Sequence, residues 1–258
     1  MKKFTKVVSL MLAAILMMAL CTACGGDSKK DDSTITFGTN AEFPPFEYVT
    51  AKGVIGEFDG IDMAIAKQIG EDNGMEAKIE NMEFDSLLLA LENGQVDAVI
   101  AGMTITDEKK DAVDFSKPYY TAKQVMIVKE DSDIQKASDM VDKKIVVLQG
   151  FTGETCVNEM GYKYESFKKG TEAIMELVNG KCDVVVIDSA TAEKYVEDNE
   201  GLKIVEDNDA FEAEEYGIAV KKGNTELLDK INKSLDKMME DGTISELSAK
   251  YAESSDAE

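Results

Sequence analysis

Apolar residues along this chain follow two repeating patterns, one typical of buried strands and one typical of amphipathic helices. The runs at 98–101 (AVIA) and 184–187 (VVVI) predict strands that are covered on both faces, as in a parallel sheet. Each run follows a segment with apolar residues at helical spacing, at 87–92 and 173–178. Helices and strands that alternate in this way favour the α/β class.

The two helix–strand segments also match each other. LLLALENGQVDAVIAGM (87–103) and AIMELVNGKCDVVVIDS (173–189) share an Asn-Gly pair that is followed at the same offset by Asp. Their glycines, Gly94 and Gly180, suit the left-handed position that ends a helix. A second pair of segments, 34–46 and 144–154, reads as a strand and a polar loop that leads toward a helix. We expect two similar lobes, each with its own parallel sheet, although βαβ units resemble one another in many proteins.

Ligand-binding loops are expected at the carboxyl ends of these strands, where open α/β sheets bind ligands. The loops are 40–46 and 102–109 in the first lobe, and 149–155 and 188–191 in the second. Gly102 and Asp188 are equivalent in the repeat, so two facing lobes would present matching corners to a small ligand.

Composition narrows the classes of function. The chain has 258 residues and a net charge of −23, and such an acidic surface disfavours nucleic-acid binding because it repels phosphate. There is no His, and all 28 basic residues are Lys, so the commonest general base and metal ligand is missing. We expect no enzyme activity, no cofactor and no metal. The acidic residues at 206–209 could bind calcium weakly, but a run of solvent-exposed charges is the better interpretation.

The first 23 residues read as an export signal rather than as part of the fold. A lysine-containing start precedes an apolar stretch at 7–20 that is short for a membrane span. LCTACGG follows, and it resembles the bacterial lipoprotein signal, in which the cysteine, here Cys24, carries the lipid. Residues 24–33 would then be a flexible tether, and lipid would hold the mature protein on the outer face of the cell membrane. A plain secretory signal and an uncleaved anchor are the alternatives.

Two cysteines, Cys156 and Cys182, remain after this signal, and export favours a disulfide between them. Asp188 marks the top of a predicted strand, which puts Cys182 roughly 20 Å below that edge. Cys156, in a helix that runs down from the same edge, lies only about 6 Å below it. A disulfide needs Cα atoms within about 7 Å of each other, so we expect two free, buried thiols.

Seven motifs together resemble those of the bacterial extracellular solute-binding proteins, family 3, which bind polar amino acids for ABC importers. In the family's order they are GTNAEFPPFEY, GIDMAIAKQI, GQVDAVIAGMTIT, VDFSKPYY, QGFTGE, VVVIDS and YGIAVKKGN. The resemblance covers residues 34 to about 252. It implies an α/β fold of the two-lobed periplasmic-binding-protein-like II (Venus-flytrap) type.

This fold implies two hinge crossings, near 121–123 and 211–214. Lobe 1 would comprise 34–121, lobe 2 would comprise 122–212, and the chain would return to lobe 1 at 213–258. The returning segment has helical periodicity that breaks at Asp241-Gly242, and the resemblance implies that it packs on lobe 1.

The resemblance also implies how the two charges of a zwitterionic ligand are paired, as buried charges must be. Asp188 would bind the ligand's ammonium, with the Gly102 carbonyl and the Thr104 hydroxyl as further acceptors. The alternative is that Asp188 caps the following helix. Thr152, at an expected helix N-terminus, would bind the carboxylate together with the nearby backbone N–H groups, in the loop that also contains Gln149.

Lys109 would be the second group on the carboxylate, at a position where the family has Arg. Lys offers a compact point charge in place of a planar bidentate fork. Either the Arg-free composition of the whole chain explains this departure, or the ligand is not a standard α-amino acid. A solvated surface lysine is the third possibility.

Aromatic side chains would hold the body of the ligand. Phe43 and Phe84 match positions at which the family sandwiches the ligand's side chain between rings, and Phe faces also attract cations. Phe84 could equally be a core residue. Asn40 stands where relatives that bind cationic side chains often have Asp, so its neutral side chain weakens the case for a basic amino acid without excluding one. Phe151 replaces a small hydroxyl residue and would narrow the pocket.

We therefore expect a lipid-anchored, extracytoplasmic substrate-binding protein that captures a small zwitterion, an amino acid in the simplest case. It would act as a monomer and deliver its ligand to the transmembrane subunits of an ABC permease. A ligand sensor and a dehydratase-like enzyme of the same fold are the alternatives. Glu42 and Glu154 are the acids near the cleft that such an enzyme would use.

Overall fold

A computed structural model describes residues 33–253 of the chain, and these residues belong to one compact unit. The export signal, the lipidation site at Cys24 and nearly all of the proposed tether lie outside the described residues. Within the described part, no helix has the length and the apolar character needed to cross a membrane.

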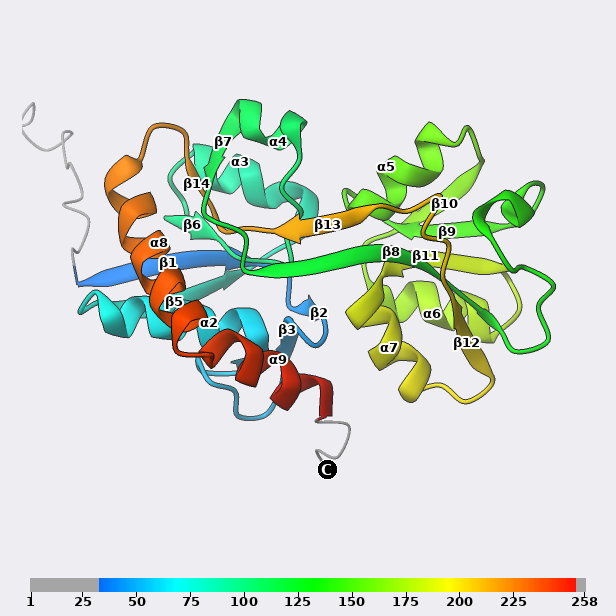
Figure 1. The fold of residues 1–258 in the computed structure, drawn as a ribbon, viewed down its shortest axis with the longest axis horizontal. Helices are drawn as coiled ribbons and strands as arrows, with labels where there is room; N and C mark the ends of the chain where they lie inside the picture. The colour runs from blue at the N-terminus through cyan, green and yellow to red at the C-terminus, as the bar shows by residue number, and fades with distance from the viewer. Residues whose placement is uncertain (1–32, 254–258) are drawn as a thin grey trace, which may run out of the picture. The chain divides into compact units, whose positions relative to one another are not determined.

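A five-stranded sheet with the order β5-β1-β6-β14-β7 organises the first lobe (Figure 1). Its strands are β1 (Thr34–Thr39), β5 (Glu76–Asn81), β6 (Ala98–Val99), β7 (Val113–Phe115) and β14 (Ala219–Lys221). β1 is parallel to β5 and β6, whereas β14 is antiparallel to β6 and β7. We call this sheet and the helices that pack on it the first lobe.

A second sheet, with the order β10-β9-β11-β8-β12, organises the second lobe. Its strands are β8 (Tyr120–Lys129), β9 (Ile145–Leu148), β10 (Tyr164–Phe167), β11 (Val184–Asp188) and β12 (Leu202–Val205). Every residue of β9 and β11 is buried, as the continuous apolar runs predict for strands covered on both faces.

The prediction of two separate sheets is confirmed, but the prediction that both are parallel is wrong. β8 is antiparallel to β11 and β12, just as β14 is antiparallel to its neighbours. β8 and β14 are the strands that enter each sheet from the other lobe, so they meet it from the opposite direction.

Helices cover both sheets. The first lobe has α2 (Ile61–Asp72), η1 (Phe84–Ser86), α3 (Leu87–Glu92), α4 (Asp107–Ala112), α8 (Thr225–Glu240) and α9 (Thr243–Glu253). The second lobe has η2 (Ala137–Met140), α5 (Thr152–Glu159), α6 (Gly170–Val178) and α7 (Ser189–Glu197). After α3 and α6, Gly94 and Gly180 have φ of 71° and 68°, which confirms the left-handed helix ends predicted for both copies of the repeat.

The C-terminal helices α8 and α9 both pack against α2 of the first lobe (Figure 1). They are separated at Asp241-Gly242, where Gly242 has φ of 85°, so the predicted break is confirmed. Ile231, Leu235 and Met238 lie on one face of α8 and are buried, as expected for an amphipathic helix.

A small three-stranded sheet lies between β1 and α2 and was not expected. It consists of β2 (Glu42–Phe43), β3 (Glu47–Val49) and β4 (Phe58–Asp59). The polar loop after β1 therefore does not lead directly to a helix. Phe43 and Phe46 are fully buried, because this turn folds their rings back into the core.

The two lobes are joined by β8 and by β13 (Ala213–Tyr216), which run antiparallel side by side (Figure 1). Their pairing extends from Tyr120 with Tyr216 to Lys123 with Ala213. These strands coincide with the predicted crossings near 121–123 and 211–214. The lobe limits 34–121, 122–212 and 213–258 stay a prediction.

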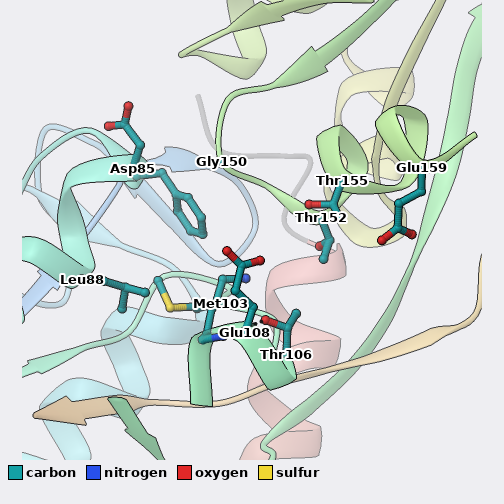
Figure 2. Close-up of a pocket in the computed structure, with 11 residues that line it drawn as sticks. Asp85, Leu88, Met103, Thr106, Glu108, Gly150, Thr152, Thr155 and Glu159 are labelled. Carbon is teal, nitrogen blue, oxygen red and sulfur yellow. Dashed lines mark hydrogen bonds between the residues drawn. The ribbon is translucent and has the colours of Figure 1, made fainter. Parts of the chain in front are cut away.

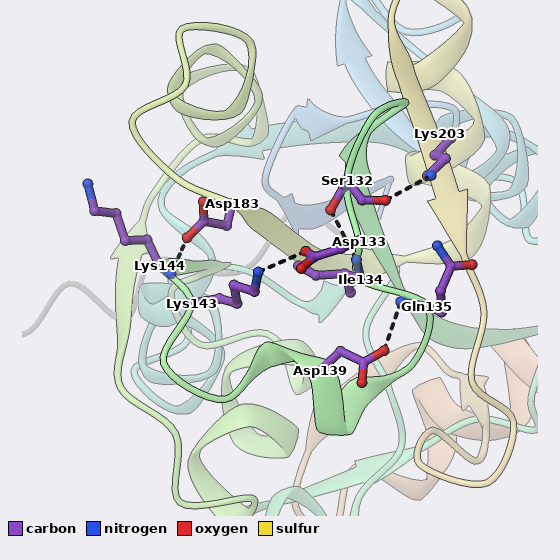
Figure 3. Close-up of polar contacts among 9 residues, drawn as sticks. All are labelled: Ser132, Asp133, Ile134, Gln135, Asp139, Lys143, Lys144, Asp183 and Lys203. Carbon is purple, nitrogen blue, oxygen red and sulfur yellow. Dashed lines mark hydrogen bonds and ion pairs between the residues drawn. The ribbon is translucent and has the colours of Figure 1, made fainter.

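Several surface charges in the second lobe pair with nearby partners (Figure 3). Lys143 lies 2.8 Å from Asp133, and the backbone N–H of Lys144 donates to Asp183 at 2.7 Å. The acids of 206–209 behave similarly, because Glu206 pairs with Lys123 and Asp207 accepts the N–H of Ala137. Exposed pairs of this kind contribute little stability, and among residues 33–253 no group of acids, His or Cys could hold a metal ion.

Cys156 and Cys182 are both free, which confirms the prediction that they form no disulfide. Cys182 is buried, but Cys156 is only half-buried, so the prediction of two buried thiols is wrong for Cys156. Cys156 is less covered because it lies on α5, a helix that packs on the sheet with only one face.

Candidate functional site

A cavity of about 560 Å³ is bounded by loops and helix starts of both lobes (Figure 2). The first lobe contributes Phe84, Asp85, Leu88, Met103, Thr106, Glu108 and Lys109, and the second contributes Gly150, Thr152, Thr155 and Glu159. Two of the four predicted ligand-binding loops, 102–109 and 149–155, therefore line this cavity, as expected for the carboxyl ends of strands. Its size suits a small molecule.

Two threonines from different lobes meet beside the cavity. The hydroxyl oxygens of Thr104 and Thr152 are 3.1 Å apart. Each hydroxyl also lies 2.8 Å from the same carboxylate oxygen, Oε2 of Glu214 in β13, and donates a hydrogen bond to it. Gln124 of β8 approaches that oxygen to 3.4 Å. The Glu214 carboxylate thus accepts hydrogen bonds from two hydroxyl groups that the resemblance to the family assigns to ligand binding.

Lys109 lies in the short helix α4, whose start is capped by Thr106. The Thr106 hydroxyl accepts the backbone N–H of Lys109 at 3.2 Å, and this cap places the lysine side chain against the cavity. The Lys109 Nζ donates to the Thr104 carbonyl at 3.2 Å. Within residues 33–253, Nζ has no carboxylate within the 4.0 Å of an ion pair.

Burial lowers the pKa of Lys109, while the negative charges of Glu214, Asp188 and Glu108 act in the opposite direction. The ammonium of Lys109 is therefore a poorly solvated charge without a direct counter-ion. An anion that enters the cavity would gain from that charge, because ionic contacts strengthen where water is excluded. The Lys109 side chain is half-buried and its Nζ donates to the Thr104 carbonyl, which argues against a solvated surface lysine.

Asp188 ends β11 and is only 2 % exposed. It occupies the position before α7, yet its side chain accepts no hydrogen bond from that helix, so the helix-cap alternative is wrong. Its carboxylate instead accepts a hydrogen bond from the Tyr216 hydroxyl. Burial, followed by the charge of Glu214, raises the pKa of Asp188 to about 7. A cation bound between Asp188 and Glu214 would offset the repulsion between the two carboxylates and favour the ionised form of Asp188.

Three aromatic rings from two lobes lie in contact. Phe84 stacks on Phe151 with ring centroids 3.9 Å apart, and Phe43 lies against the same Phe151 ring at 5.0 Å. Phe84 lines the cavity, whereas Phe43 and Phe151 do not. The structure brings all three predicted residues together, with the second-lobe ring inserted against the two first-lobe rings.

The other candidate residues have contacts within the protein. The Asn40 side chain donates to the Met82 carbonyl at 2.9 Å and does not line the cavity. The Gly102 N–H donates to Asp62 at 2.8 Å, and its φ of 51° keeps the backbone close to the Phe43 ring. The Gln149 side chain donates to Asp85 of the other lobe at 2.9 Å.

Glu214 is the residue that sequence reasoning missed. In a strand, residues two apart share a face, so the buried Tyr216 marks the inner face of β13 and Glu214 lies on it. That alternation in the segment 213–216 (AEEY) was available in the sequence, but the segment was read only as a hinge.

Comparison with known proteins shows the family to which the chain belongs. A model of the bacterial extracellular solute-binding proteins, family 3, matches residues 35–254. The chain belongs to this family. Its members are extracellular, so the protein has an extracytoplasmic location, and a role as a substrate-binding protein follows.

Similar proteins bind amino acids according to their names. The chain is 35 % identical to the arginine-binding extracellular protein ArtP of Bacillus subtilis, over 94 % of this chain and 96 % of that one. Its structure resembles the arginine-, lysine-, histidine-binding protein ArtJ of Geobacillus stearothermophilus, with a TM-score of 0.79, 34 % identity, and coverage of 84 % and 94 %. It also resembles an ancestral arginine-binding protein bound to glutamine, with a TM-score of 0.79, 43 % identity, and coverage of 85 % and 97 %.

These solute-binding relatives remove the dehydratase-like alternative, since neither the family nor the named relatives are enzymes. The acids proposed for such chemistry are also engaged elsewhere. Glu42 pairs with Lys169 at 2.9 Å, and Glu154 accepts the N–H of Gly150 at 2.7 Å. Neither acid lines the cavity.

Proposed function

We propose that this family 3 protein captures an α-amino acid in the cavity between its lobes and delivers it to an ABC permease while a lipid on Cys24 holds it at the membrane. The observation that carries the proposal is the charge arrangement. Lys109 is a half-buried lysine without a direct counter-ion, and it interacts electrostatically with two carboxylates, the buried Asp188 and the half-buried Glu214. A zwitterion supplies the opposite charge to each.

At one end, the ligand's carboxylate would contact Lys109 and Thr152. Thr152 is the first residue of α5, so the partial positive charge of the helix start adds to the lysine charge. The Thr152 hydroxyl already donates to a carboxylate, that of Glu214. In the complex, the ligand's carboxylate would accept this hydrogen bond from Thr152 in place of Glu214.

At the other end, the ligand's ammonium would lie between Asp188 and Glu214. These carboxylates repel each other, which is one cause of the raised pKa of Asp188. An ammonium with three N–H donors would satisfy both, and its charge would favour the ionised form of Asp188.

The side chain of the ligand would extend toward the outer part of the cavity. Asp85, Glu108 and Glu159 are among the residues that line the cavity, and three acidic residues favour a cationic side chain. Relatives named for arginine, lysine and histidine support this choice. The carboxamide of Asn40 is already engaged by the Met82 carbonyl, so we assign it no role in holding that cation.

A thermal-shift screen over the twenty amino acids, followed by calorimetric titration, tests this function. A ligand that binds only the folded state raises the melting temperature, and we expect the largest shift from a cationic amino acid. The variant Lys109→Met should lose at least tenfold in affinity. Lys110→Met is the matched control, because Lys110 is exposed and pairs only with the neighbouring Asp107. Absence of binding by every amino acid would refute the proposal.

The lipid anchor needs its own test, because Cys24 lies outside the described residues. We expect Cys24→Ala to release the protein from the membrane fraction of cells, whereas Cys21→Ala, its matched control in the same segment, leaves it bound. Release by neither variant would show that another feature anchors the chain.

A further inference from the structure

Two carboxyl groups of the first lobe, those of Glu47 in β3 and Asp62 in α2, touch each other in the core. Both residues are 0 % exposed, and their side chains are in hydrogen-bonding contact. Apart from this mutual contact, no donor among residues 33–253 reaches either oxygen of Glu47 or Oδ1 of Asp62. Two ionised carboxylates in such contact would repel each other strongly, because charges inside a protein are poorly screened.

The titratable groups around this pair add negative charge or none. Burial, followed by the negative charges of Asp62 and Asp188, raises the pKa of Glu47 well above its usual value. Tyr119 also contacts the pair, and burial, Asp62 and Glu47 raise its pKa as well. Within residues 33–253, no lysine lies within the 4.0 Å of an ion pair from either carboxylate. A proton held between the two carboxyl groups would remove the repulsion.

The hydrogen bonds indicate which residue carries the proton. Oδ2 of Asp62 accepts the N–H of Gly102 and the hydroxyl of Tyr119, both at 2.8 Å. Asp62 also lies in the first turn of the twelve-residue helix α2, where the helix dipole favours a negative charge. Two donors and a helix start stabilise the ionised form, whereas Glu47 accepts from no N–H group in the described chain. Asp62 is therefore the carboxylate, its Oδ1 is the available acceptor, and Glu47 is the acid.

Asp62 links two segments near the candidate site. Gly102 begins the loop 102–109, and its φ of 51° together with the nearby Phe43 ring restricts its backbone. Tyr119 directly precedes β8, the first strand that connects the lobes, and its N–H donates to the Tyr216 carbonyl at 3.0 Å. Because Gly102 and Tyr119 share one carboxylate oxygen, the start of the loop and the start of the connecting strand are held together.

We propose that Glu47 and Asp62 form a proton-binding site in the first lobe, with one proton carried by Glu47 and donated to ionised Asp62, and that Asp62 is a positioning residue for Gly102 and Tyr119. The proton site is independent of the proposed function. The positioning role rests on that function, because Gly102 belongs to the proposed ligand-binding loop. At pH 7 the folded protein then contains a neutral carboxylic acid at Glu47, although glutamate in water is ionised at this pH.

Infrared difference spectroscopy of the ligand-free protein at pH 7 tests the proton site. A neutral carboxylic acid has a C=O stretching band that an ionised carboxylate lacks, so the wild type should show this band and Glu47→Gln should lose it. The glutamine amide can donate to Asp62 as the protonated acid does. Glu57→Gln is the matched control, because Glu57 is exposed beside β4, and we expect that variant to keep the band.

Identical spectra of the wild type and Glu47→Gln in this band overturn the proton site and leave the proposed function standing. Should Glu47→Gln fail to fold, Asp188→Asn replaces it, since that variant removes the buried acid whose pKa is raised to about 7. The folded Asp188→Asn protein should show the neutral-acid band at pH 7 and lose it on thermal unfolding. Absence of the band from the folded protein also overturns the proton site.

Calorimetric titration with L-lysine, or with the amino acid that gives the largest thermal shift, tests the positioning role. Asp62→Ala leaves the Gly102 N–H and the Tyr119 hydroxyl without their acceptor, so affinity should fall at least tenfold. Asp62→Asn should stay within about threefold of the wild type, because its amide oxygen can still accept from both donors. Rescue by asparagine distinguishes the lost acceptor from a general loss of packing.

An Asp62→Ala protein that binds like the wild type overturns the positioning role and leaves the proposed function standing. Should Asp62→Ala fail to fold, amide hydrogen exchange of Gly102 in the wild type replaces it. We expect slow exchange, and exchange as fast as that of the exposed Gly56 overturns the positioning role. Absence of binding by any of the twenty amino acids to the wild type overturns the proposed function and the positioning role, whereas the infrared result for Glu47 is unaffected.

Discussion

The hydroxyl oxygens of Thr104 and Thr152 lie 3.1 Å apart although the two residues belong to different lobes. Both donate to Glu214 in β13, a strand that connects the lobes. A ligand that engages either hydroxyl therefore acts on both lobes and on their connection at once. We therefore expect closure of the lobes to be sensitive to what occupies the site.

Glu214→Gln should weaken amino-acid binding about tenfold, a change of about 1.4 kcal/mol. The substitution removes one of the two carboxylates that would hold the ligand's ammonium, yet the glutamine oxygen can still accept from Thr104 and Thr152. Calorimetric titration measures the effect. Glu215→Gln is the matched control, because Glu215 is exposed on the opposite face of β13. Equal affinities of Glu214→Gln and the wild type would remove Glu214 from the ammonium site.

Lys109→Arg separates the two explanations for the lysine at this position. If the Arg-free composition of the chain explains it, arginine should tighten amino-acid binding, because its planar fork makes two hydrogen bonds to a carboxylate. Dissociation constants of the two proteins for the same amino acid provide the test. Unchanged or abolished binding would instead point to a ligand that is not a standard α-amino acid.

Binding should weaken as the pH falls below about 7. The pKa of Asp188 is raised to about 7 in the free protein, and a bound ammonium lowers it, so binding releases a proton at lower pH. Above pH 7 the carboxylate is already ionised and the dependence should level off. Titrations from pH 5 to 8.5, in buffers of different ionisation enthalpy, measure both effects. Asp188→Asn should bind weakly and with a flatter profile between pH 6 and 8, and a profile as steep as the wild type's would assign the titration to another group.

Stability should decrease as the pH rises from about 4 to about 7. Burial raises the pKa of Asp62 to about 6 and raises the pKa of Glu47 well above its usual value. The folded state then holds protons that the unfolded chain has released, so these groups stabilise the fold at low pH and this contribution is lost as the pH passes their folded pKa values. Urea unfolding at several pH values measures the slope.

Glu47→Gln isolates part of this effect, because Glu47 is fully buried and glutamine cannot ionise. The variant should lose less stability than the wild type between pH 5 and 8. If the free energy of unfolding of Glu47→Gln changes with pH as steeply as that of the wild type, other carboxyl groups control the pH dependence.

Much of the fold was predictable because buried strands and helix ends require particular residue types, such as continuous apolar runs and glycines. The apolar runs of β9 and β11, the glycines after α3 and α6, and the break before α9 all appear in the structure as expected. The small sheet β2–β4 was missed because strands of two or three residues are too short to show a period. Strand direction was missed as well, since β8 and β14 have the same apolar pattern whether they run parallel or antiparallel.

The candidate site was predicted in part. Resemblance to the family led to Lys109, Thr152 and Asp188, and the structure places them in one neighbourhood. It did not lead to Glu214: the alternation in 213–216 places this residue on the inner face of its strand, but the contacts of Glu214 with Thr104 and Thr152 depend on how the two lobes meet. Asn40 lies close in sequence to the site, but its side chain is engaged by the Met82 carbonyl, a contact that depends on the packing of β5 beside β1.

The most direct test of the account compares an amino acid that binds with two analogues, each lacking one charged pole. L-lysine, its decarboxylated diamine and its deaminated acid retain the same side chain, so calorimetric titration isolates the α-carboxylate and the α-ammonium. Each charged contact is worth about 1.5–3 kcal/mol, and we predict that both analogues bind at least tenfold more weakly than lysine. Either analogue binding as tightly as lysine would contradict the claim that the lobes jointly hold both poles of a zwitterion.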